Sequence, residues 1–542
     1  MSKKVAILGG GIAGLTAAQE LAERDFEVDV YEKRSIFGGK ARSVEVPDSA
    51  TDGRDPLPGE HGFRFFPNFY KHVFDTMENI PYADNENGVL DNLVETTHWM
   101  FARRGDPEVA LPLNISTDLD DWLTLYDVLL GDELDIPDEE SRFFVSRILT
   151  FLTSCQKRRD EEYDQISWWD FIEAERMSDN YQEFHAVGLT RGLVALEPRD
   201  GSTRTVGTIY VQMLLGLLLT WLHVDSVLDG PTNDVWIDPW VDHLDQKGVT
   251  LHPETRVESL DYHDGRIVSA TVSDGSETRT ISADYFIAAL PVEVMTELVT
   301  EEIAEAAPDL ADIDELETAW MNGIQFYFDE NVPVNQGHVI YAESPWALTS
   351  VTQQLFWEDI DFADYGDGDV DSILSLCISD WNTPGEVVEK PAKECTPEEI
   401  KEEVWAQLVH RLNDDEQAEL ENATIVDWFL DPDIEHPSPN ETTNAEPLLI
   451  NTVGSRKHRP EADTSIRNLF LASDYVRTHT DLATMEGANE AARRAVNAIL
   501  ADGSPDADRC EIWPLEEPSI FEPWKTYDRI RYELGLPHHS LA

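Results

Sequence analysis

The sequence predicts an α/β protein built on a Rossmann-like domain, into which a second, α+β domain is inserted. Two observations place the Rossmann-like domain at the start of the chain. An apolar strand at residues 5 to 8 runs into a G-x-G-x-x-G turn, and a second apolar strand follows and ends in an acid. The third observation is length, because 542 residues exceed what one hydrophobic core usually holds.

The three glycines of the turn have separate roles in binding a dinucleotide. Gly9 allows the tight turn, Gly11 lets a pyrophosphate approach the backbone, and Gly14 lets the following helix pack closely on the strand. The phosphates would lie at the N-terminus of that helix, where free N–H groups and the helix dipole attract anions. The turn therefore predicts a dinucleotide-binding site.

The second strand, residues 28 to 31, leads directly to Glu32. This acid comes eighteen residues after Gly14, which is about the distance at which a carboxylate meets a ribose hydroxyl in such a domain. An acid at this position favours a free 2′-hydroxyl over a 2′-phosphate. The predicted ligand therefore carries an unphosphorylated ribose.

Three further segments favour FAD over NAD. Gly39 belongs to a glycine pair followed by Lys40 and Arg42. Such a segment would let a second stretch of backbone and two positive charges approach the pyrophosphate. Far downstream, an apolar strand ends at Asp474, and residues 484 to 492 begin a helix rich in small residues. The N-terminus of such a helix would stabilise the negative charge of a reduced flavin.

At these residues the chain resembles the FAD-dependent amine oxidase and phytoene desaturase superfamily, in its hydroxysqualene dehydroxylase-like or carotenoid desaturase-like branch. The likeness covers nearly the whole chain, with the glycine turn, residues 59 to 67 and residues 471 to 497 as its motifs. Lys40 stands where the pattern more often has Arg, and Ser473 where it has Gly. The resemblance implies FAD as cofactor, with Glu32 on the ribose, Lys40 and Arg42 at the pyrophosphate, the Val257 backbone facing the adenine, Asp474 at the pyrophosphate or ribityl end, and Met485 beside the flavin.

Both predicted domains are discontinuous. We expect residues 76 to 231 to be rich in helices and residues 301 to 449 to form an antiparallel sheet over the flavin. Six aromatic residues of that sheet are candidates for the substrate pocket or for the core: Trp320, Tyr327, Trp346, Phe356, Trp357 and Trp381. The predicted boundaries are 1–75, 232–300 and 450–502 for the FAD-binding domain, 76–231 and 301–449 for the substrate-binding domain, and 503–542 for a tail that wraps the surface.

The predicted catalytic residues are His61 and Arg64, which are the polar side chains expected near the flavin ring. His61 would donate or accept a proton, or else serve as a hydrogen-bonded structural histidine. The sequence contains no Ser-His-Asp order and no metal-ligand spacing, so we predict chemistry carried by the flavin and no metal site.

The charge of the chain is extreme, with 107 acidic against 40 basic residues and a net charge of −67. Such a balance opposes binding to nucleic acid and to anionic membrane surfaces through simple charge. The acids are spread along the whole chain, between segments that keep the apolar patterns of strands and helices. This distribution favours a protein that folds in a high-salt cytoplasm over an acidic protein of an ordinary cytoplasm. Four widely spaced cysteines and a start without a signal peptide also indicate a cytoplasmic location.

The longest apolar run, residues 209 to 222, allows two interpretations. It is either a core helix or a segment that lines a tunnel for an oily substrate or touches a membrane face. The leading function is hydride transfer between flavin N5 and a long apolar, isoprenoid substrate, by desaturation or reductive dehydroxylation. The alternatives are an amine oxidase that releases hydrogen peroxide and a carrier that holds FAD without catalysis. The oligomeric state stays open.

Overall fold

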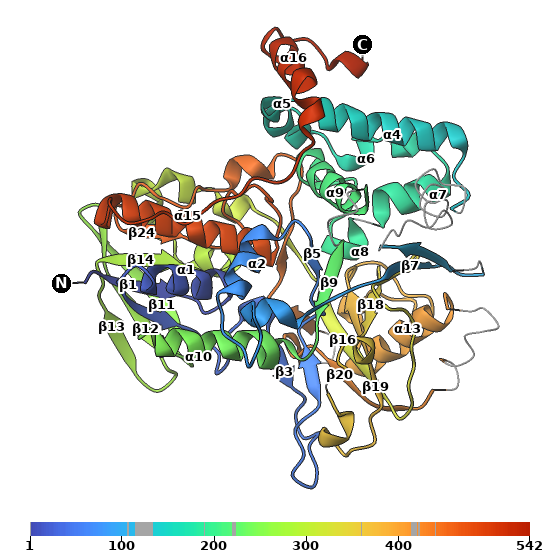
Figure 1. Cartoon of the computed structure of the whole chain (residues 1–542), viewed down its shortest axis with the longest axis horizontal. Helices are drawn as coiled ribbons and strands as arrows, with labels where there is room; N and C mark the ends of the chain where they lie inside the picture. The colour runs from blue at the N-terminus through green and yellow to red at the C-terminus, as the bar shows by residue number, and fades with distance from the viewer. Residues whose placement is uncertain are drawn as a thin grey trace.

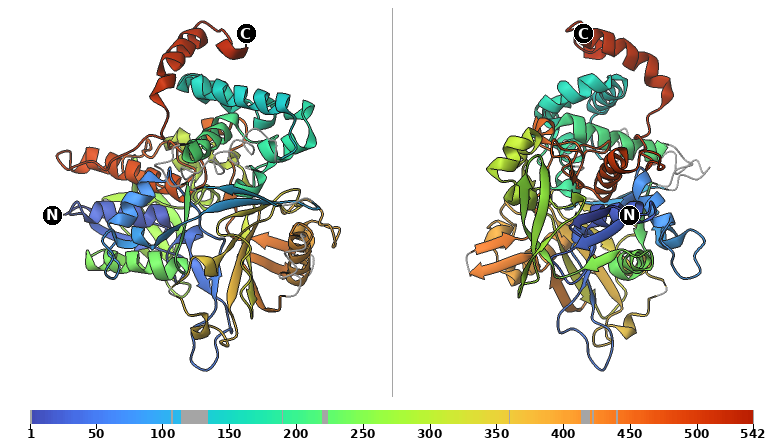
Figure 2. Two further views of the ribbon diagram at one scale, coloured as in Figure 1. Left: turned by 45° about the vertical axis from the view of Figure 1, so that its right-hand side comes forward. Right: turned by 90° about the vertical axis from the view of Figure 1, so that its left-hand side faces the viewer.

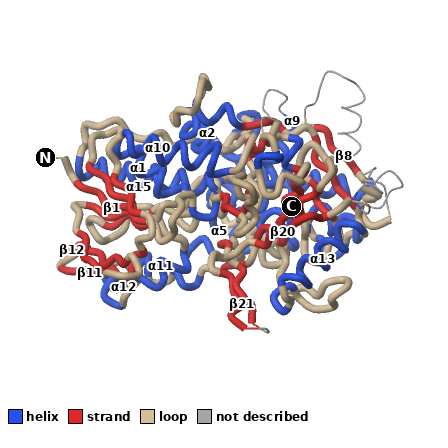
Figure 3. The backbone as a smooth tube through the Cα atoms, turned by 90° about the horizontal axis from the view of Figure 1, so that it is seen from below, coloured by secondary structure: helices blue, strands red, loops and turns tan. Residues whose placement is uncertain are grey.

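Figure 1 shows the computed structural model of the chain as two β-sheet regions side by side, with a group of helices above them. The structure describes residues 2–105, 108–113, 134–188, 190–218, 224–358, 360–412, 420, 423–438 and 441–541. Seen from below, strands β1, β11 and β12 lie toward one end of the molecule, and β8 and β20 toward the other (Figure 3).

The first region is a five-stranded parallel sheet in the order β10-β2-β1-β14-β24. Its strands come from distant parts of the chain, and the apolar side chains of β1 and β14 are buried. This sheet confirms the predicted α/β, Rossmann-like fold. The strands are β1 (Lys4–Leu8), β2 (Glu27–Tyr31), β10 (Thr250–His252), β14 (Tyr285–Ala288) and β24 (Leu469–Leu471).

Two helices that begin at this sheet pack against each other, α1 (Ile12–Ala22) and α15 (Met485–Gly503). The side chain of Thr484 caps α15 by accepting a hydrogen bond from the Gly487 N–H at 3.0 Å. Gly9 has a φ of 111°, and a Cβ placed there would lie 2.2 Å from the Ala289 carbonyl oxygen. The strand-to-helix turn therefore requires glycine at this position.

A small antiparallel sheet of β11 (Arg256–His263), β12 (Arg266–Ser273) and β13 (Thr278–Ile281) follows β10. Short elements connect these regions. They are β3 (Ser43–Glu45), β4 (Pro58–Glu60), β5 (Phe66–Pro67), β6 (Leu93–Glu95), β9 (Asp225–Leu228), α2 (Lys71–Glu78), α10 (Asp238–Gln246), α11 (Val292–Leu298) and α12 (Glu301–Ala306).

The second large sheet has seven strands in the order β20-β16-β19-β18-β17-β7-β8. The prediction of an antiparallel sheet from residues 301 to 449 is incomplete, because β7 and β8 come from the segment predicted as helical, and β7 pairs with β17 in parallel. The strands are β7 (His98–Ala102), β8 (Val109–Pro112), β16 (Asn322–Phe328), β17 (Val339–Tyr341), β18 (Thr349–Thr352), β19 (Ser372–Ile378) and β20 (Ile425–Leu430).

Helix α13 (Pro397–Val409) packs its apolar face on this sheet, with Ile400, Val404 and Leu408 among the side chains of β16 and β19. Five of the six aromatic residues predicted for the pocket or the core are buried in the apolar clusters of this region, and Trp320 packs against one of them. These aromatic residues therefore belong to the apolar cores on the two sides of the sheet.

The upper group contains α4 (Asp138–Thr153), α5 (Gln156–Glu161), α6 (Trp168–Phe171), α8 (Arg191–Val194) and α9 (Thr203–Leu218). The C-terminal segment was predicted to wrap the surface, but it forms helix α16 (Glu522–Glu533), which lies over α4 and α5 at the end of the molecule (Figures 1 and 2). In the described parts of the chain, no helix has both the length and the apolar character needed to cross a membrane.

Candidate active site

One cavity of about 640 Å³ joins the parallel sheet to the helices above it. At one end it is lined by the turn after β1 and by the N-terminal turn of α15, and at the other by α8 and α9. Residues far apart in the sequence therefore meet around a single space. A cavity of this size, mostly apolar with a few polar groups, is typical of a cofactor and substrate site.

Eight of the ten predicted cofactor residues line the first end of this cavity. Gly14 lies inside α1, where an added Cβ would be 1.9 Å from the Gly9 carbonyl oxygen, as expected for close packing of helix on strand. Arg42 is the second exception. The eight lining residues are Gly9, Gly11, Glu32, Gly39, Lys40, Val257, Asp474 and Met485.

The space where a side chain at Gly11 would lie is not filled by any other part of the described protein. A Cβ at this position would meet nothing closer than the Gly39 Cα, at 3.5 Å. The φ of Gly11 is −80°, which any residue adopts. The absence of a side chain at Gly11 is therefore not required for folding, and it fits a cradle into which a phosphate group approaches the backbone.

Glu32 is held in place by two backbone hydrogen bonds. Its carboxylate accepts from the Gly10 N–H at 2.8 Å and from the Arg34 N–H at 2.9 Å. Burial raises the pKa of the Glu32 carboxyl group, and the two hydrogen bonds lower it only in part. The carboxylate is thus fixed at the cavity wall, at the end where a ribose is expected.

Arg42 lies elsewhere than predicted. The prediction put it at the pyrophosphate, but its buried guanidinium pairs with Asp433 and, at 2.7 Å, with the Glu446 carboxylate. It also donates to the Gly39 carbonyl oxygen at 2.7 Å. Arg42 therefore fixes the turn around Gly39 from behind, and Lys40 is the neighbouring cation that reaches the cavity.

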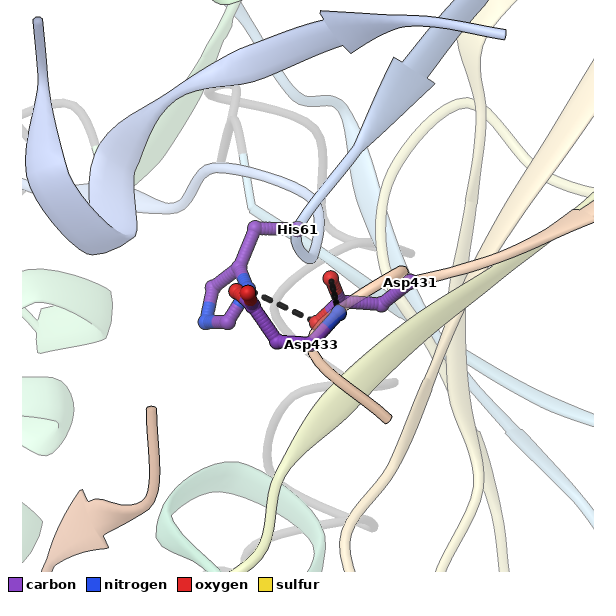
Figure 4. A group of neighbouring side chains, drawn as sticks. All are labelled: His61, Asp431 and Asp433. Atoms are coloured by element: carbon purple, nitrogen blue, oxygen red, sulfur yellow. Dashed lines mark hydrogen bonds and ion pairs between the residues drawn. The ribbon is translucent and has the colours of Figure 1, made fainter. Parts of the chain in front are cut away.

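His61 lies between two carboxylates, and no sequence motif indicated this arrangement (Figure 4). Its Nδ1 is 2.7 Å from the Asp431 Oδ2 and 3.3 Å from the Asp433 Oδ2. Burial lowers the pKa of the imidazole, but the charge and hydrogen bond of Asp431 and the hydrogen bond to Asp433 outweigh it, and the net shift is upward. Figure 4 shows the other ring nitrogen, Nε2, directed away from both carboxylates.

The same three side chains could geometrically hold a cation, since their ligand atoms lie within 4.8 Å of one another. Asp433, however, is already paired with Arg42 and, at 2.6 Å, with Arg34. We therefore interpret the group as an ion network that holds the His61 ring in place.

Arg64 also lines the cavity and connects the His61 loop to the cofactor turn. It donates to the Lys40 carbonyl oxygen at 3.0 Å and to the carbonyl oxygen of Gly62. Its guanidinium lies 3.8 Å from the carboxylate of Glu60. Burial raises the pKa of Glu60 to about 7. Arg64 therefore holds the loop that carries His61 against the cofactor turn.

The opposite end of the cavity is apolar and aromatic. Helix α9 turns one face toward it, with residues spaced along successive turns: Thr205, Val206, Ile209, Tyr210 and Met213. Only the first part of the predicted apolar run thus reaches the cavity, while Leu215 and Leu217 are buried in the core and residues 219–222 lie outside the described parts of the chain. None of the six predicted aromatic residues, all of them described, lines the cavity.

Sequence reasoning missed four aromatic residues that do line the cavity, Phe63, Phe65, Phe69 and Tyr70. A signal was present, because five aromatic residues are concentrated in the ten positions that begin at His61.

The parallel sheet, the glycine turn and the cavity at the carboxyl ends of its strands define a dinucleotide-binding protein. Residues 12–500 match the profile of the flavin containing amine oxidoreductases, and the chain belongs to this family. The protein is therefore a flavoenzyme with FAD as its cofactor. The open backbone at Gly11 and the fixed carboxylate of Glu32 fit that cofactor.

Distant relatives extend over the whole chain. The 15-cis-phytoene desaturase of Synechococcus elongatus is 22% identical, over 92% of this chain and 96% of its own length. The zeta-carotene desaturase of Synechocystis sp. is 25% identical, over 92% of this chain and 97% of its own. Among solved structures, cyclohexylamine oxidase from Brevibacterium oxydans has the same fold, with a TM-score of 0.60, 13% identity, and coverage of 93% of this chain and 99% of that one.

Proposed function

We propose that the protein transfers a hydride between flavin N5 and a long apolar, isoprenoid substrate, by desaturation or by reductive dehydroxylation. The observation that carries this proposal is the continuous cavity, which passes from the cofactor residues to an apolar wall formed by α9. FAD, when bound, supplies the hydride acceptor or donor. The full-length likeness to two carotenoid desaturases supports the isoprenoid class.

The chain's own residues would bind this substrate mainly by burying hydrocarbon. Ile209 and Met213 of α9 line the same cavity as Phe63 and Phe65. Burial of apolar surface contributes roughly 25 cal/mol per Å², so a long chain gains affinity without many polar contacts. These side chains would also exclude water from the reacting carbon.

His61 would hold a proton at Nε2 on the cavity side. Two carboxylates beside Nδ1 raise the pKa of the imidazole and so favour its charged form, in which Nε2 carries a hydrogen that can be donated to a leaving or developing anion. Arg64 would position the loop that carries His61. We propose these two residues as the catalytic pair of the site.

An amine oxidase is the second candidate, favoured by the fold shared with cyclohexylamine oxidase. The charges that line the cavity do not separate the two candidates, because Lys40 and Arg64 are accompanied there by acids that include Glu293 and Asp474. A panel of amines assayed for hydrogen peroxide separates the two candidates. Lipid analysis of a deletion strain tests the proposal itself, with accumulation of an isoprenoid precursor as the expected result and an unchanged lipid profile as the contrary one.

A charge on the cavity wall should separate substrate turnover from cofactor binding. In Met213→Asp, we expect turnover of the isoprenoid substrate to fall at least about tenfold while FAD content stays near that of the wild type, because Met213 lines the end formed by α9. Val268→Asp, at an exposed position of β12, is the matched control. Equal loss of FAD and turnover in Met213→Asp would contradict the proposed division of the cavity.

We also propose a high-salt cytoplasm as the protein's location, with peripheral contact to a membrane. The net charge of −67 is the basis for the first part. We expect the melting temperature to rise steeply between about 0.1 M and a few molar KCl, because concentrated cations screen repulsion among carboxylates. Thermal unfolding followed by circular dichroism measures this, and a flat melting temperature would remove the argument.

A further inference from the structure

Exposed apolar side chains gather at the C-terminal end of the molecule. Among the described residues, Ile520 is 74% exposed and Leu534 is 69% exposed, and Trp524, Tyr527 and Ile530 are about half exposed. Other large apolar residues exposed on the surface are scattered singly, such as Val268 on β12 and Val387. Single residues of that kind are ordinary, whereas a contiguous group marks an interaction site.

The apolar residues of α16 form one stripe. Trp524, Tyr527, Ile530 and Leu534 are spaced three or four residues apart, which places them along the same side of the helix. Leu149 of α4, the helix beneath, is exposed as well. The group formed by Ile520, Leu536 and this stripe is called the α16 patch below.

Helix α16 is firmly attached to the body through Asp528, which lies beside the apolar stripe. Asp528 is fully buried, and its carboxylate accepts hydrogen bonds from the Arg158 guanidinium at 2.9 and 3.0 Å and from the Cys155 N–H at 3.0 Å. The Ser540 and Thr150 hydroxyl groups are 2.6 Å apart. The patch is therefore presented by a fixed helix, which stands at the outer end of the molecule in both views of Figure 2.

We propose that the α16 patch docks the enzyme on the surface of a lipid bilayer, an inference that rests on the proposed apolar substrate. The patch has the composition of an interfacial helix, in which Trp and Tyr accompany aliphatic side chains. Helix α9 packs on α4 and α5 with one side and lines the cavity with another. Helices α4 and α5 therefore contact α16, which carries the patch, and also α9, which lines the substrate end of the cavity.

Charge favours a bilayer over a second copy of the chain. The acids of the chain outnumber its bases by 107 to 40, yet on α16 the cations Lys525, Arg529 and Arg531 balance the acids, of which Asp528 is buried. A symmetric dimer would bring together two chains that each carry a net charge of −67. A bilayer of zwitterionic lipid carries no such charge, and Arg529, whose side chain is 68% exposed, could reach its phosphate groups.

Vesicle flotation of the FAD-loaded, full-length protein tests the docking. The probes are phosphatidylcholine vesicles with and without phosphatidylglycerol, and the variant is Trp524→Glu combined with Ile530→Glu. We expect the wild type to float with both vesicles and the variant to lose binding by roughly tenfold or more, since two apolar anchors become charged. Val268→Glu combined with Val387→Glu is the control, with the same charge change at exposed apolar positions elsewhere.

Three outcomes would overturn the proposal. They are a wild type that does not float, a patch variant that floats as well as the control, and a wild-type dimer by light scattering that the patch variant makes monomeric. Circular dichroism and FAD content check the fold, and Leu534→Glu serves if the double variant misfolds. Flotation needs no turnover, so a protein that floats yet oxidises amines would refute only the proposed substrate.

Discussion

Gly11→Ala should give a folded protein that no longer retains FAD. A methyl group at Gly11 meets the nearest protein atom at 3.5 Å, which is ordinary contact, and the backbone φ of −80° suits alanine. The same methyl group would occupy the space through which the pyrophosphate approaches the backbone. We expect FAD affinity to fall by about a hundredfold or more, which corresponds to ~2.7 kcal/mol.

Flavin absorbance after gel filtration measures this loss, and thermal unfolding of the apo forms reports the fold. Gly9→Ala is the contrasting variant, because its Cβ would lie 2.2 Å from the Ala289 carbonyl oxygen and its φ is 111°. That variant should be destabilised with or without FAD. Normal FAD content in Gly11→Ala would show that the phosphate site lies elsewhere.

Arg42→Met should cause the largest loss of stability among the charged residues of the site. The substitution keeps much of the side-chain volume but leaves the buried carboxylates of Asp433 and Glu446 without their main partner. Removing one member of a buried ion pair costs about 3 to 5 kcal/mol. Arg34 also contacts both carboxylates, so we expect the lower end of this range at neutral pH.

The pH dependence of this effect has a definite sign. Burial raises the pKa of both carboxyl groups, but other effects outweigh it and the net shift is below the usual values. At Asp433 these effects are the hydrogen bond from His61 and the charge of Arg42. At Glu446 the main one is the charge of Arg42. The stabilisation by the two carboxylates is therefore present above the unfolded pKa of about 4 and is lost as the pH falls toward the folded values. The difference in unfolding free energy between wild type and Arg42→Met should shrink below about pH 4.

Urea denaturation at neutral and acidic pH measures that difference. Arg256→Met is the control, because Arg256 is largely exposed and lies 3.8 Å from its acidic partners. Exposed pairs contribute about 0 to 1 kcal/mol. A loss in Arg42→Met no greater than in this control would contradict the assigned role of Arg42.

The cofactor half of the site could be predicted from the sequence because its signals are local. Gly9, Gly11 and Glu32 lie within one strand–helix–strand unit, whose spacing alone brings them to the end of the sheet. Val257, Asp474 and Met485 came from the resemblance, and all three line the cavity. Their individual contacts with FAD stay predictions.

The partners of charged residues could not be predicted, since they depend on contacts across the fold. Arg42 and Glu446 are separated by some four hundred positions, and nothing near Arg42 in the sequence indicates that its charge is neutralised. The same applies to His61, whose acidic neighbours follow β20. The strands β7 and β8 were missed because the order of strands in a sheet is set by tertiary packing.

The central claim, hydride transfer between FAD and an apolar isoprenoid, is tested most directly by anaerobic rapid mixing. The FAD-loaded enzyme, in oxidised and in reduced form, is mixed with 15-cis-phytoene, with a hydroxylated isoprenoid and with cyclohexylamine while flavin absorbance is recorded. We predict that phytoene bleaches the oxidised flavin or that the hydroxylated isoprenoid restores the colour of the reduced flavin, and that the amine does neither. Bleaching by cyclohexylamine, with no response to either isoprenoid, would contradict the account.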